Sequence, residues 1–409
     1  MSDLVNFNSG PLRIDILVDE TLREGVERSA FAVDDDNRYA LLEKMVDAGL
    51  REFVLGISPE RPSLLQKCLD GKADGHLPTD ARFVFITLLN SWETTYDYLT
   101  LLPRECLQDF ILSFGMIELK SQEQLLEKVV ESFRSIGVNS FKASILVNFR
   151  PGLSEEVYGR IVGQVRRCLD NGISTIRIND SVGALYPEMT TALCKQLVTD
   201  FPGVNFCLHA HDDRGLALAN ALASVNAGFN MIEGTLAGLG NRAGMPSMEL
   251  IAKIAEERNV RFGNCVLNTR KLIESSHFAD EIFMNMPNVY RPVSGWFVNN
   301  VNFGPLNIPD YLNAQGEREY VLNIAALHPK TIREALQATQ FDDHLTHDDK
   351  FISDLMDLLE VRLIQVYREK QPEYKALLHQ FKTLYDTCWL GLADIREAAS
   401  ALASTAGAA

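Results

Sequence analysis

The sequence predicts an α/β fold, specifically a (β/α)8 TIM barrel followed by a mainly helical C-terminal region. From Arg13 to about residue 260, short β-branched or aromatic runs alternate with longer stretches of helical spacing, and there are eight of each. Eight such units in strict alternation indicate a parallel sheet that closes on itself. No G-x-G-x-x-G follows the first run, which argues against the usual dinucleotide-binding form of an open, doubly wound sheet.

Each unit of the predicted barrel begins with a strand. The predicted strands are Ile14–Val18, Glu52–Ile57, Arg82–Leu88, Phe110–Phe114, Ser140–Ile145, Ser174–Ile178, Asn205–His209 and Met231–Gly234. The amphipathic stretches that follow them are 34–48, 60–70, 93–101, 121–136, 154–171, 187–200, 215–228 and 247–259. Gly49, Gly137, Gly172 and Gly228 each follow one of these stretches, where glycine commonly ends a helix.

The alternation stops after residue 260, which divides the chain into two predicted parts. Residues 1–260 form the TIM-barrel catalytic domain, and residues 261–409 form a C-terminal linker with a helical lid or dimerisation region. Asn, Pro and Gly are frequent in residues 261–325, whereas residues 330–402 have helical apolar spacing.

Composition narrows the class of function. The 409 residues include 39 Lys and Arg against 55 Asp and Glu, so the formal net charge is −16. This excess disfavours binding to nucleic acid or to an anionic membrane. Seven scattered cysteines without a C-x-x-C pair fit a reducing compartment. With no signal-like amino terminus and no long apolar run, we expect a cytoplasmic protein that acts on small molecules.

Polar residues follow two strands that open onto the same end of the barrel. Asp19–Gly25 follows the first strand, and the seventh strand ends at His209-Ala210-His211. Side chains at i and i+2 of a strand point the same way, so both histidines face the barrel mouth. Together with a carboxylate from the first strand they form a candidate site for a divalent metal with open positions. The alternatives are a pair of ordinary polar strand-end histidines and, for Arg23 with Glu24, a surface ion pair.

Four blocks of sequence resemble a known superfamily. They run from Asp19 to Gly25, from Asp180 to Gly183, from His209 to Asn220 and from Gly238 to Gly244, in that order. These blocks resemble the signatures of the DRE-TIM metallolyases, also called HMGL-like. That superfamily includes the homocitrate, isopropylmalate and citramalate synthases and hydroxymethylglutaryl-CoA lyase. The Arg-Glu-Gly form of the first block is similar to the homocitrate synthases.

The resemblance implies roles for particular residues. It implies that Glu24, His209 and His211 bind a divalent metal (Zn, Mn or Mg). Arg23 matches the arginine that stabilises the enolate or the carbonyl oxygen of a 2-oxo acid, and Ser181 stands where the family holds the 1-carboxylate.

The same resemblance suggests where the two substrates bind. The loop that carries Gly238, Gly240, Arg242 and Gly244 would close over the acyl end of acetyl-CoA, the co-substrate. Lys142 and Ser144 stand where homocitrate synthases bind the distal carboxylate, so the 2-oxo acid is expected to carry a second acidic group.

The chain also departs from the family pattern. The neutral amide of the family's Gly-Glu-Gln is replaced by Glu27, and no Cys lies between residues 208 and 264, which disfavours a lyase. The segment Phe297–Leu312 lacks the histidine with which the synthases supply a base. The candidates for the catalytic base are therefore Glu27, His328 and Tyr311.

The resulting hypothesis is a metal-dependent acyltransferase that condenses acetyl-CoA with a 2-oxo acid and acts as a homodimer. The alternatives are a carbon–carbon lyase similar to HMG-CoA lyase, a catalytically inactive paralogue, and a non-haem iron oxygenase that uses the two-histidine, one-carboxylate site.

Overall fold

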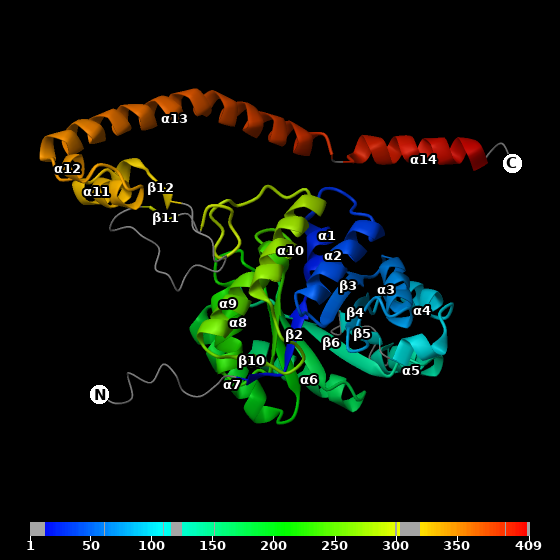
Figure 1. Ribbon diagram of the computed structural model, residues 1–409. Helices are drawn as coiled ribbons and strands as arrows, with labels where there is room; N and C mark the ends of the chain where they lie inside the picture. The colour runs from blue at the N-terminus through cyan, green and yellow to red at the C-terminus, as the bar shows by residue number, and fades with distance from the viewer. Residues whose placement is uncertain are drawn as a thin grey trace, which may run out of the picture. The chain divides into compact units, whose positions relative to one another are not determined.

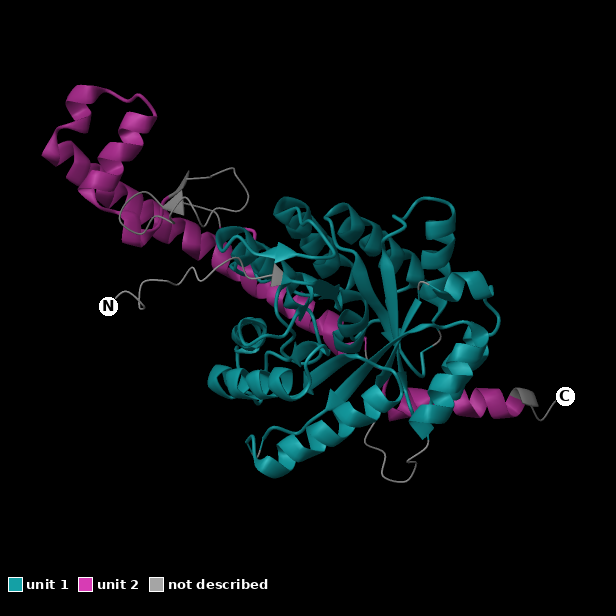
Figure 2. Cartoon of the chain, turned by 90° about the horizontal axis from the view of Figure 1, so that it is seen from below, with its two compact units in different colours: residues 1–295 teal, residues 296–409 magenta. Residues whose placement is uncertain are grey.

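The chain forms two compact units in this computed structural model, residues 1–295 and 296–409 (Figure 2). The structure describes residues 13–60, 62–108, 110–115, 125–150, 152–298, 301–302, 320–388 and 390–406. The division falls later than residue 260 because α10 (Thr269–Ile282) packs against two helices of the barrel, α2 and α9.

Eight parallel strands form the barrel, and each lies where the sequence predicts it (Figure 1). They are β2 (Ile16–Asp19), β3 (Glu52–Ile57), β4 (Arg82–Leu88), β5 (Phe110–Gly115), β6 (Ser140–Leu146), β7 (Thr175–Asp180), β8 (Asn205–Ala210) and β9 (Met231–Gly234). Neighbours in sequence are hydrogen-bonded from β2 to β8, and β9 returns to pair with β2, Asp19 lying opposite Gly234. Since β8 also contacts β9, the ring is complete and the predicted TIM barrel is confirmed.

Helices follow the strands as predicted. They are α2 (Asp35–Asp47), α3 (Ser63–Ala73), α4 (Trp92–Leu99), α5 (Leu125–Ile136), α6 (Glu155–Asp170), α7 (Pro187–Asp200), α8 (Ala217–Asn226) and α9 (Met248–Glu257). The glycines expected to end four of them, at positions 49, 137, 172 and 228, all have positive φ angles. This left-handed conformation costs glycine little because it has no Cβ.

Two helices of the barrel unit were not predicted, α1 (Thr21–Arg28) and α10. Helix α1 follows β2 after a single residue, Glu20, whose side chain makes no capping hydrogen bond. Eight residues with a glycine at position 25 give a weak helical signal. The first signature block is therefore a strand end followed by a helix.

Smaller elements complete the barrel unit. The short strands β1 (Arg13–Ile14) and β10 (Arg261–Phe262) pair in parallel. Single 3-10 turns are formed by η1 (Arg104–Gln108) and η2 (Leu236–Gly238). Turn η2 begins the glycine-rich loop that follows β9.

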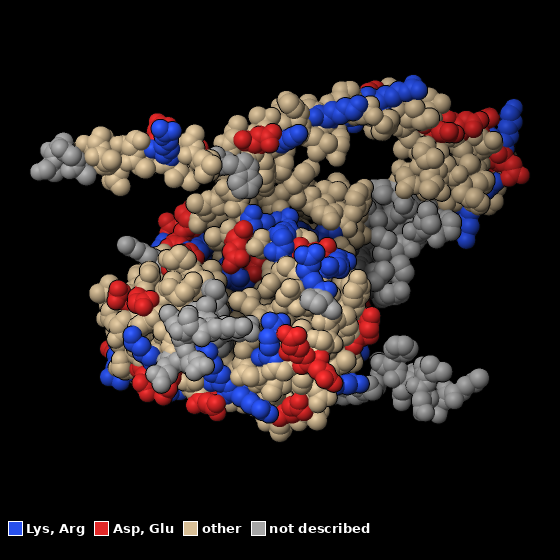
Figure 3. Space-filling model, turned by 180° about the vertical axis from the view of Figure 1, so that it is seen from behind, with Lys and Arg blue, Asp and Glu red and all other residues tan. Residues whose placement is uncertain are grey.

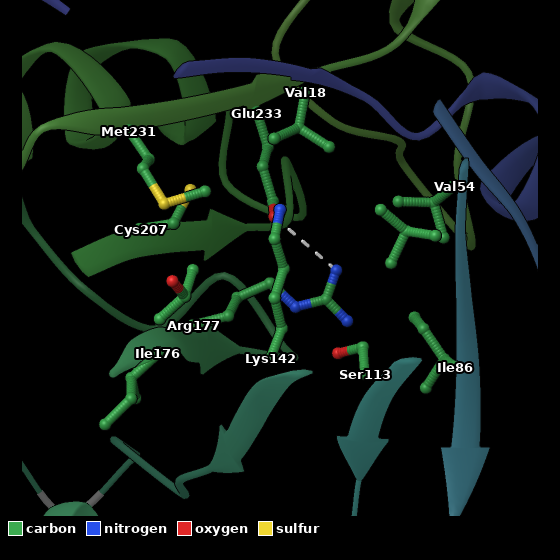
Figure 4. Close-up of a pocket in the computed structure, with 12 residues that line it drawn as sticks. Val18, Val54, Ile86, Ser113, Lys142, Ile176, Arg177, Cys207, Met231 and Glu233 are labelled. Atoms are coloured by element: carbon green, nitrogen blue, oxygen red, sulfur yellow. Dashed lines mark ion pairs between the residues drawn. The ribbon is translucent and has the colours of Figure 1, made fainter. Parts of the chain in front are cut away.

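The barrel interior contains both apolar and charged side chains. An apolar cluster inside the barrel comprises Val18, Val54, Val84, Ile86, Ile111, Cys207 and Met231. Lys142, Arg177 and Glu233, from β6, β7 and β9, point into the same space (Figure 4). The cavity that remains is about 20 Å³, room for about one water molecule. Charged side chains are therefore part of the packed core of the barrel.

The second unit is helical, which confirms the helices predicted over residues 330–402. Its helices are α11 (Pro329–Ala338), α12 (Asp343–Thr346), α13 (Asp349–Asp386) and α14 (Leu392–Ala406). Asp342 and Asp348 cap the amino ends of α12 and α13 with their side chains. Before them lie the paired strands β11 (Val301–Asn302) and β12 (Tyr320–Val321) and the turn η4 (Ile324–Ala326).

Acidic and basic side chains are interspersed over the face of the barrel unit in Figure 3. Within the described part of the chain, no helix combines the length and the apolar character needed to cross a bilayer.

Candidate metal centre

The first candidate ligand, Glu24, is presented by the turn from β2 into α1. Both oxygens of Asp19, the last residue of β2, accept hydrogen bonds from Thr21, one from its backbone N (2.9 Å) and one from its Oγ1 (2.8 Å). Burial raises the pKa of Asp19 to about 7, although both of these bonds oppose the rise. The turn holds α1 so that Glu24, in its first turn, is fully buried.

The two histidines come from the carboxyl end of β8 and face the interior, as their i and i+2 spacing predicts. His209 Nε2 lies 3.3 Å from Glu24 Oε1, and His211 Nε2 lies 3.8 Å from the same oxygen. One ligand atom from each of the three residues lies within 4.8 Å of the others. The structure thus brings together the three residues that the resemblance names as ligands.

Glu24 and His211 have protonation states that suit metal binding. For His209, burial is outweighed by hydrogen bonds to Glu233 and Glu24, which raise the pKa of its imidazole. Burial and the neighbouring His209 lower the pKa of His211 to about 4, so its imidazole is neutral at pH 7. Burial opposes ionisation of Glu24, but Arg23 and the two histidines outweigh it and hold the pKa of this carboxyl well below its usual value. A neutral imidazole and an ionised carboxylate are the forms that ligate a metal.

The donor set fits a divalent cation. Within the described residues, Glu24 Oε1 and His211 Nδ1 are buried atoms that make no hydrogen bond. Glu24 Oε1 is the atom on which both histidines converge, and its other close neighbour is Arg23 Nη2 at 2.6 Å. Two imidazoles and one carboxylate suit Zn²⁺ and related divalent ions. Glu24, His209 and His211 would hold such an ion.

Three buried residues that the sequence reasoning missed surround these ligands. Glu233 Oε2 lies 2.9 Å from His209 Nδ1, and Arg177 and Glu20 lie behind it in the barrel interior. Because one imidazole nitrogen bonds to a carboxylate, the other is left to face the metal position. The available signal was a charged residue at an inward position of an otherwise apolar strand, as in Thr175-Ile176-Arg177-Ile178.

Arg23 and Glu27 lie one helical turn apart on α1. Arg23 is buried and contacts three carboxylates, with its Nη1 2.9 Å from Glu27 Oε1 and its Nε 2.8 Å from Glu20 Oε2. The side chain of Glu27 is 30% exposed, so it lies where the buried cluster meets solvent. Arg23 therefore lies beside the candidate metal ligand Glu24. The carboxylate of Glu27, which could accept a proton, lies beside another nitrogen of the same guanidinium.

The glycine-rich loop after β9 reaches the site through its backbone. Asn241 N donates to Glu24 Oε2 (2.8 Å), which leaves Oε1 for the histidines. A Cβ at Gly240 would lie 3.1 Å from that same Oε2. The side chain of Arg242 forms a two-point ion pair with Asp213 (2.8 Å each) and bonds to Ser181 O. The loop is thus fastened to the ends of β7 and β8.

A cavity of about 460 Å³ lies next to this loop. Gly238, Met245 and Pro246 line it together with Leu218 of α8. The charged residues of the lining are Asp212, Arg28 of α1 and Arg291, which is paired with Asp280. Its volume is within the range of small-molecule sites. The loop expected to contact acetyl-CoA therefore borders a cavity large enough for part of that molecule.

The residues expected to recognise a second acidic group already have partners. Lys142 Nζ forms an ion pair with Glu52, at the amino end of β3, and Ser144 Oγ accepts a hydrogen bond from Arg177 Nε (3.0 Å). Both side chains lie within the barrel. These contacts favour the structural interpretation of Lys142, and its role in specificity stays a prediction.

The other candidates for the base lie outside the barrel unit. His328 precedes α11, and its Nδ1 accepts a hydrogen bond from Lys330 N (3.2 Å), so it caps a helix in the second unit. Tyr311 lies outside the described residues.

Replacing Gly244 by alanine is expected to displace the loop and lower activity. Gly244 has φ +100°, and a Cβ there would lie 2.0 Å from Gly238 O. We therefore expect the free energy of unfolding, measured by thermal denaturation, to fall by more than about 1 kcal/mol, which is the cost of an unfavourable φ angle alone. Gly203→Ala is the matched control, because Gly203 also has positive φ but nothing within 4 Å of its Cβ position. Equal losses of stability and activity in the two variants would contradict the proposed close packing of this loop.

Comparison with known proteins supports the resemblance inferred from the four blocks. Residues 116–278 match the family model described as HMGL-like. A homocitrate synthase of Sulfolobus acidocaldarius is 25% identical over 275 residues, which cover 65% of this chain and 56% of that protein. A homocitrate synthase of Sulfurisphaera tokodaii is 38% identical over 127 residues, 31% of this chain and 27% of the relative. The chain thus spans about half or less of the length of these relatives.

Solved structures agree on the fold. A hydroxymethylglutaryl-CoA lyase from Pseudomonas aeruginosa matches with a TM-score of 0.55 and 17% identity, over 70% of this chain and 98% of that one. The HMG-CoA lyase of Bacillus subtilis matches with a TM-score of 0.54 and 16% identity, over 67% and 95%. At these identities the likeness establishes the barrel fold, and the family match confirms that the chain contains an HMGL-like domain.

Proposed function

We propose that this chain, which contains an HMGL-like domain, is a metal-dependent acyltransferase that condenses acetyl-CoA with a 2-oxo acid. The observation that carries the proposal is the convergence of His209 and His211 on Glu24 Oε1, with Arg23 beside the same oxygen. The relatives named homocitrate synthase support a condensation rather than a cleavage. The products would be a 2-substituted malate and free CoA.

Each residue of the cluster has a part in this reaction. A divalent ion held by the three ligands would act as a Lewis acid on the 2-oxo acid. Arg23 would donate to the oxygen on which negative charge develops. We assign the removal of a proton from the acetyl methyl group to Glu27, because this carboxylate lies beside Arg23 and reaches solvent. The enolate carbon then adds to the carbonyl carbon of the 2-oxo acid, whose C=O π bond opens to an alkoxide that takes up a proton. Water hydrolyses the thioester and releases CoA as a thiol.

The second acidic group on the 2-oxo acid is the finer part of the proposal. It depends on Lys142, whose charge Glu52 balances, and on Ser144, which Arg177 engages. A substrate carboxylate would have to compete with Glu52 for the lysine. A comparison of 2-oxo acids with and without a second acidic group tests whether Lys142 and Ser144 recognise it.

The test is thiol release from acetyl-CoA with Zn²⁺, Mn²⁺ or Mg²⁺, across 2-oxo acids with short, branched and acidic side chains. Turnover with one or more members supports the proposal, and a preference for an acidic member that Lys142→Met removes supports the second acidic group. Metal binding without turnover on the panel would contradict the synthase assignment. Cleavage of a hydroxyacyl-CoA in a parallel assay would then favour a lyase. No reaction in either assay would favour an inactive paralogue.

We also propose that the chain forms a homodimer through residues 261–409. Helices α13 and α14 expose large apolar side chains, among them Leu358, Val361, Leu377, Leu392 and Ile395. Apolar surface of this extent commonly marks a protein interface. The mass in solution, measured by light scattering, should be twice 45.7 kDa. A monomer at micromolar concentration would contradict this proposal.

A further inference from the structure

A closed ring of buried charges connects the candidate metal ligands through the barrel interior. Its members, in order, are Glu24, Arg23, Glu20, Arg177, Glu233 and His209, and His209 returns to Glu24. Each of them is less than one tenth exposed. Glu20 joins β2 to α1, and Arg23 and Glu24 belong to α1. Arg177, His209 and Glu233 belong to β7, β8 and β9, so the ring lines the part of the barrel where these neighbouring elements meet.

One arm of the ring runs from Arg177 to the carboxylate ligand. Arg177 Nη1 pairs with Glu20 Oε1, and the other oxygen of Glu20 accepts from Arg23 Nε (2.8 Å). Arg23 Nη2 then lies 2.6 Å from Glu24 Oε1, the oxygen that faces the histidines. The position of Glu24 therefore depends on Arg23, and that of Arg23 depends on Glu20.

The other arm runs from Arg177 to the histidine ligand. The same Nη1 lies 3.6 Å from Glu233 Oε1, an ion pair drawn as a dashed line in Figure 4. Glu233 Oε2 lies 2.9 Å from His209 Nδ1. His209 Nε2 is thereby turned toward Glu24, 3.3 Å from Oε1.

Arg177 is the member from which both arms start, and it is itself held in place. Its Nε donates to Ser144 Oγ (3.0 Å) on the neighbouring strand β6. A guanidinium presents several donors in a fixed plane, so it can bond a serine and two carboxylates at once, which an ammonium cannot do with the same geometry. Without this cation, Glu20 and Glu233 would be two buried carboxylates that repel each other.

We propose that Arg177 is a positioning residue that sets the geometry of Glu24 and His209 together, through Glu20 on one side and Glu233 on the other. It would not contact the metal or the substrate. Its effect would appear in metal affinity and in ligand geometry, because outer partners orient the ligands themselves. This inference rests on the metal centre of the proposed function.

Metal binding to Arg177→Met tests the inference directly. Zn²⁺ affinity, measured by competition with a chelating dye, should fall by about 10- to 100-fold, the effect typical of outer partners of metal ligands. The absorption spectrum of the Co²⁺-loaded protein should change as well. Arg177→Lys should recover part of the affinity because it retains the charge. Parent-like Zn²⁺ affinity and Co²⁺ spectrum in Arg177→Met would overturn the inference.

Arg38→Met is the matched control for the loss of a buried arginine. Arg38 is 4% exposed and pairs with Asp35 and Glu60, away from the ring. It should lose thermal stability with no change in Zn²⁺ affinity. If the parent protein itself binds no Zn²⁺ or Co²⁺, the metal centre and thus the proposed function fails, an outcome distinct from failure of the Arg177 inference.

A second set of variants covers the case in which Arg177→Met does not fold. Glu20→Gln and Glu233→Gln each keep the size of the side chain and break one arm. Because both arms share Arg177, the loss of Zn²⁺ affinity in the double variant should differ from the product of the single losses by at least about twofold. Losses that multiply without such a deviation would show that the arms are independent and would overturn the inference.

Discussion

Replacing Glu24 by alanine is expected to abolish metal binding and turnover together. Glu24 Oε1 is the atom on which His209 and His211 converge, and Oε2 is bonded to Asn241 N in the glycine-rich loop. Its loss removes one ligand and loosens the loop over the site. We expect metal affinity to fall further than the about 10- to 100-fold seen for outer partners. Turnover should fall by about 10³-fold or more, since a Lewis acid contributes several kcal/mol.

The measurement is metal content by mass spectrometry alongside thiol release from acetyl-CoA. Glu24→Asp is the matched control, because it retains a carboxylate on a shorter side chain. It should retain measurable metal. Stoichiometric, tightly bound metal in Glu24→Ala would show that the ion is held elsewhere.

Replacing Arg23 by glutamine is expected to reduce kcat by about 10²- to 10³-fold even when the protein is saturated with metal. The loss in rate is the usual effect of removing a donor from an oxygen that gains charge in the transition state. Metal affinity should fall as well, because Arg23 holds Glu24 and also pairs with Glu20 and Glu27, so saturating metal is needed to isolate the effect on kcat. The same substitution breaks the ring of buried charges, so thermal stability should fall as well.

Steady-state kinetics with saturating metal, together with a metal titration, separate these effects. Arg23→Lys keeps the charge but not the planar fork, and it should recover only part of kcat. A parent-like kcat in Arg23→Gln once the metal is saturating would mean that Arg23 acts only by holding Glu24 and not on the substrate. An unchanged kcat would exclude the role in stabilising charge.

The pairing of charged side chains inside the barrel explains why the sequence alone does not reveal whether the substrate carries a second acidic group. Lys142 and Ser144 occupy positions that the resemblance assigns to a distal carboxylate, yet one pairs with Glu52 and the other with Arg177. Glu52 and Lys142 are 90 residues apart in the chain, and nothing near either of them indicates the pairing. The local sequence around a charged residue on a buried strand is the same whether that residue binds a substrate or forms an ion pair with a neighbouring side chain.

Helix α1 is a second feature that local sequence patterns did not predict. The residues Arg23 and Glu24 were identified by their motif, but the segment was not predicted as a helix because eight residues with an interior glycine give little propensity. Tertiary contacts stabilise it: Asn241 N donates to Glu24 Oε2, and Leu236 N donates to Thr21 Oγ1. The same holds for the boundary at residue 295, which depends on how α10 packs against α2 and α9.

By itself, the sequence determined the barrel, its eight strands and the three residues that meet as candidate metal ligands. The barrel and the histidine pair follow from local patterns: alternating strands and helices, glycines that end helices, and two histidines spaced to face one side of a strand. Glu24 was identified by the resemblance of its sequence block to the metallolyase signature. Only the tertiary structure decided which buried charges became partners. Arg177 and Glu20 are 157 residues apart, and they meet because β9 pairs with β2 and closes the barrel, which brings the end of β2 near β7, β8 and β9. Inside a low-dielectric core each charge must find a counter-charge in three dimensions, and that choice is set by strand order and register.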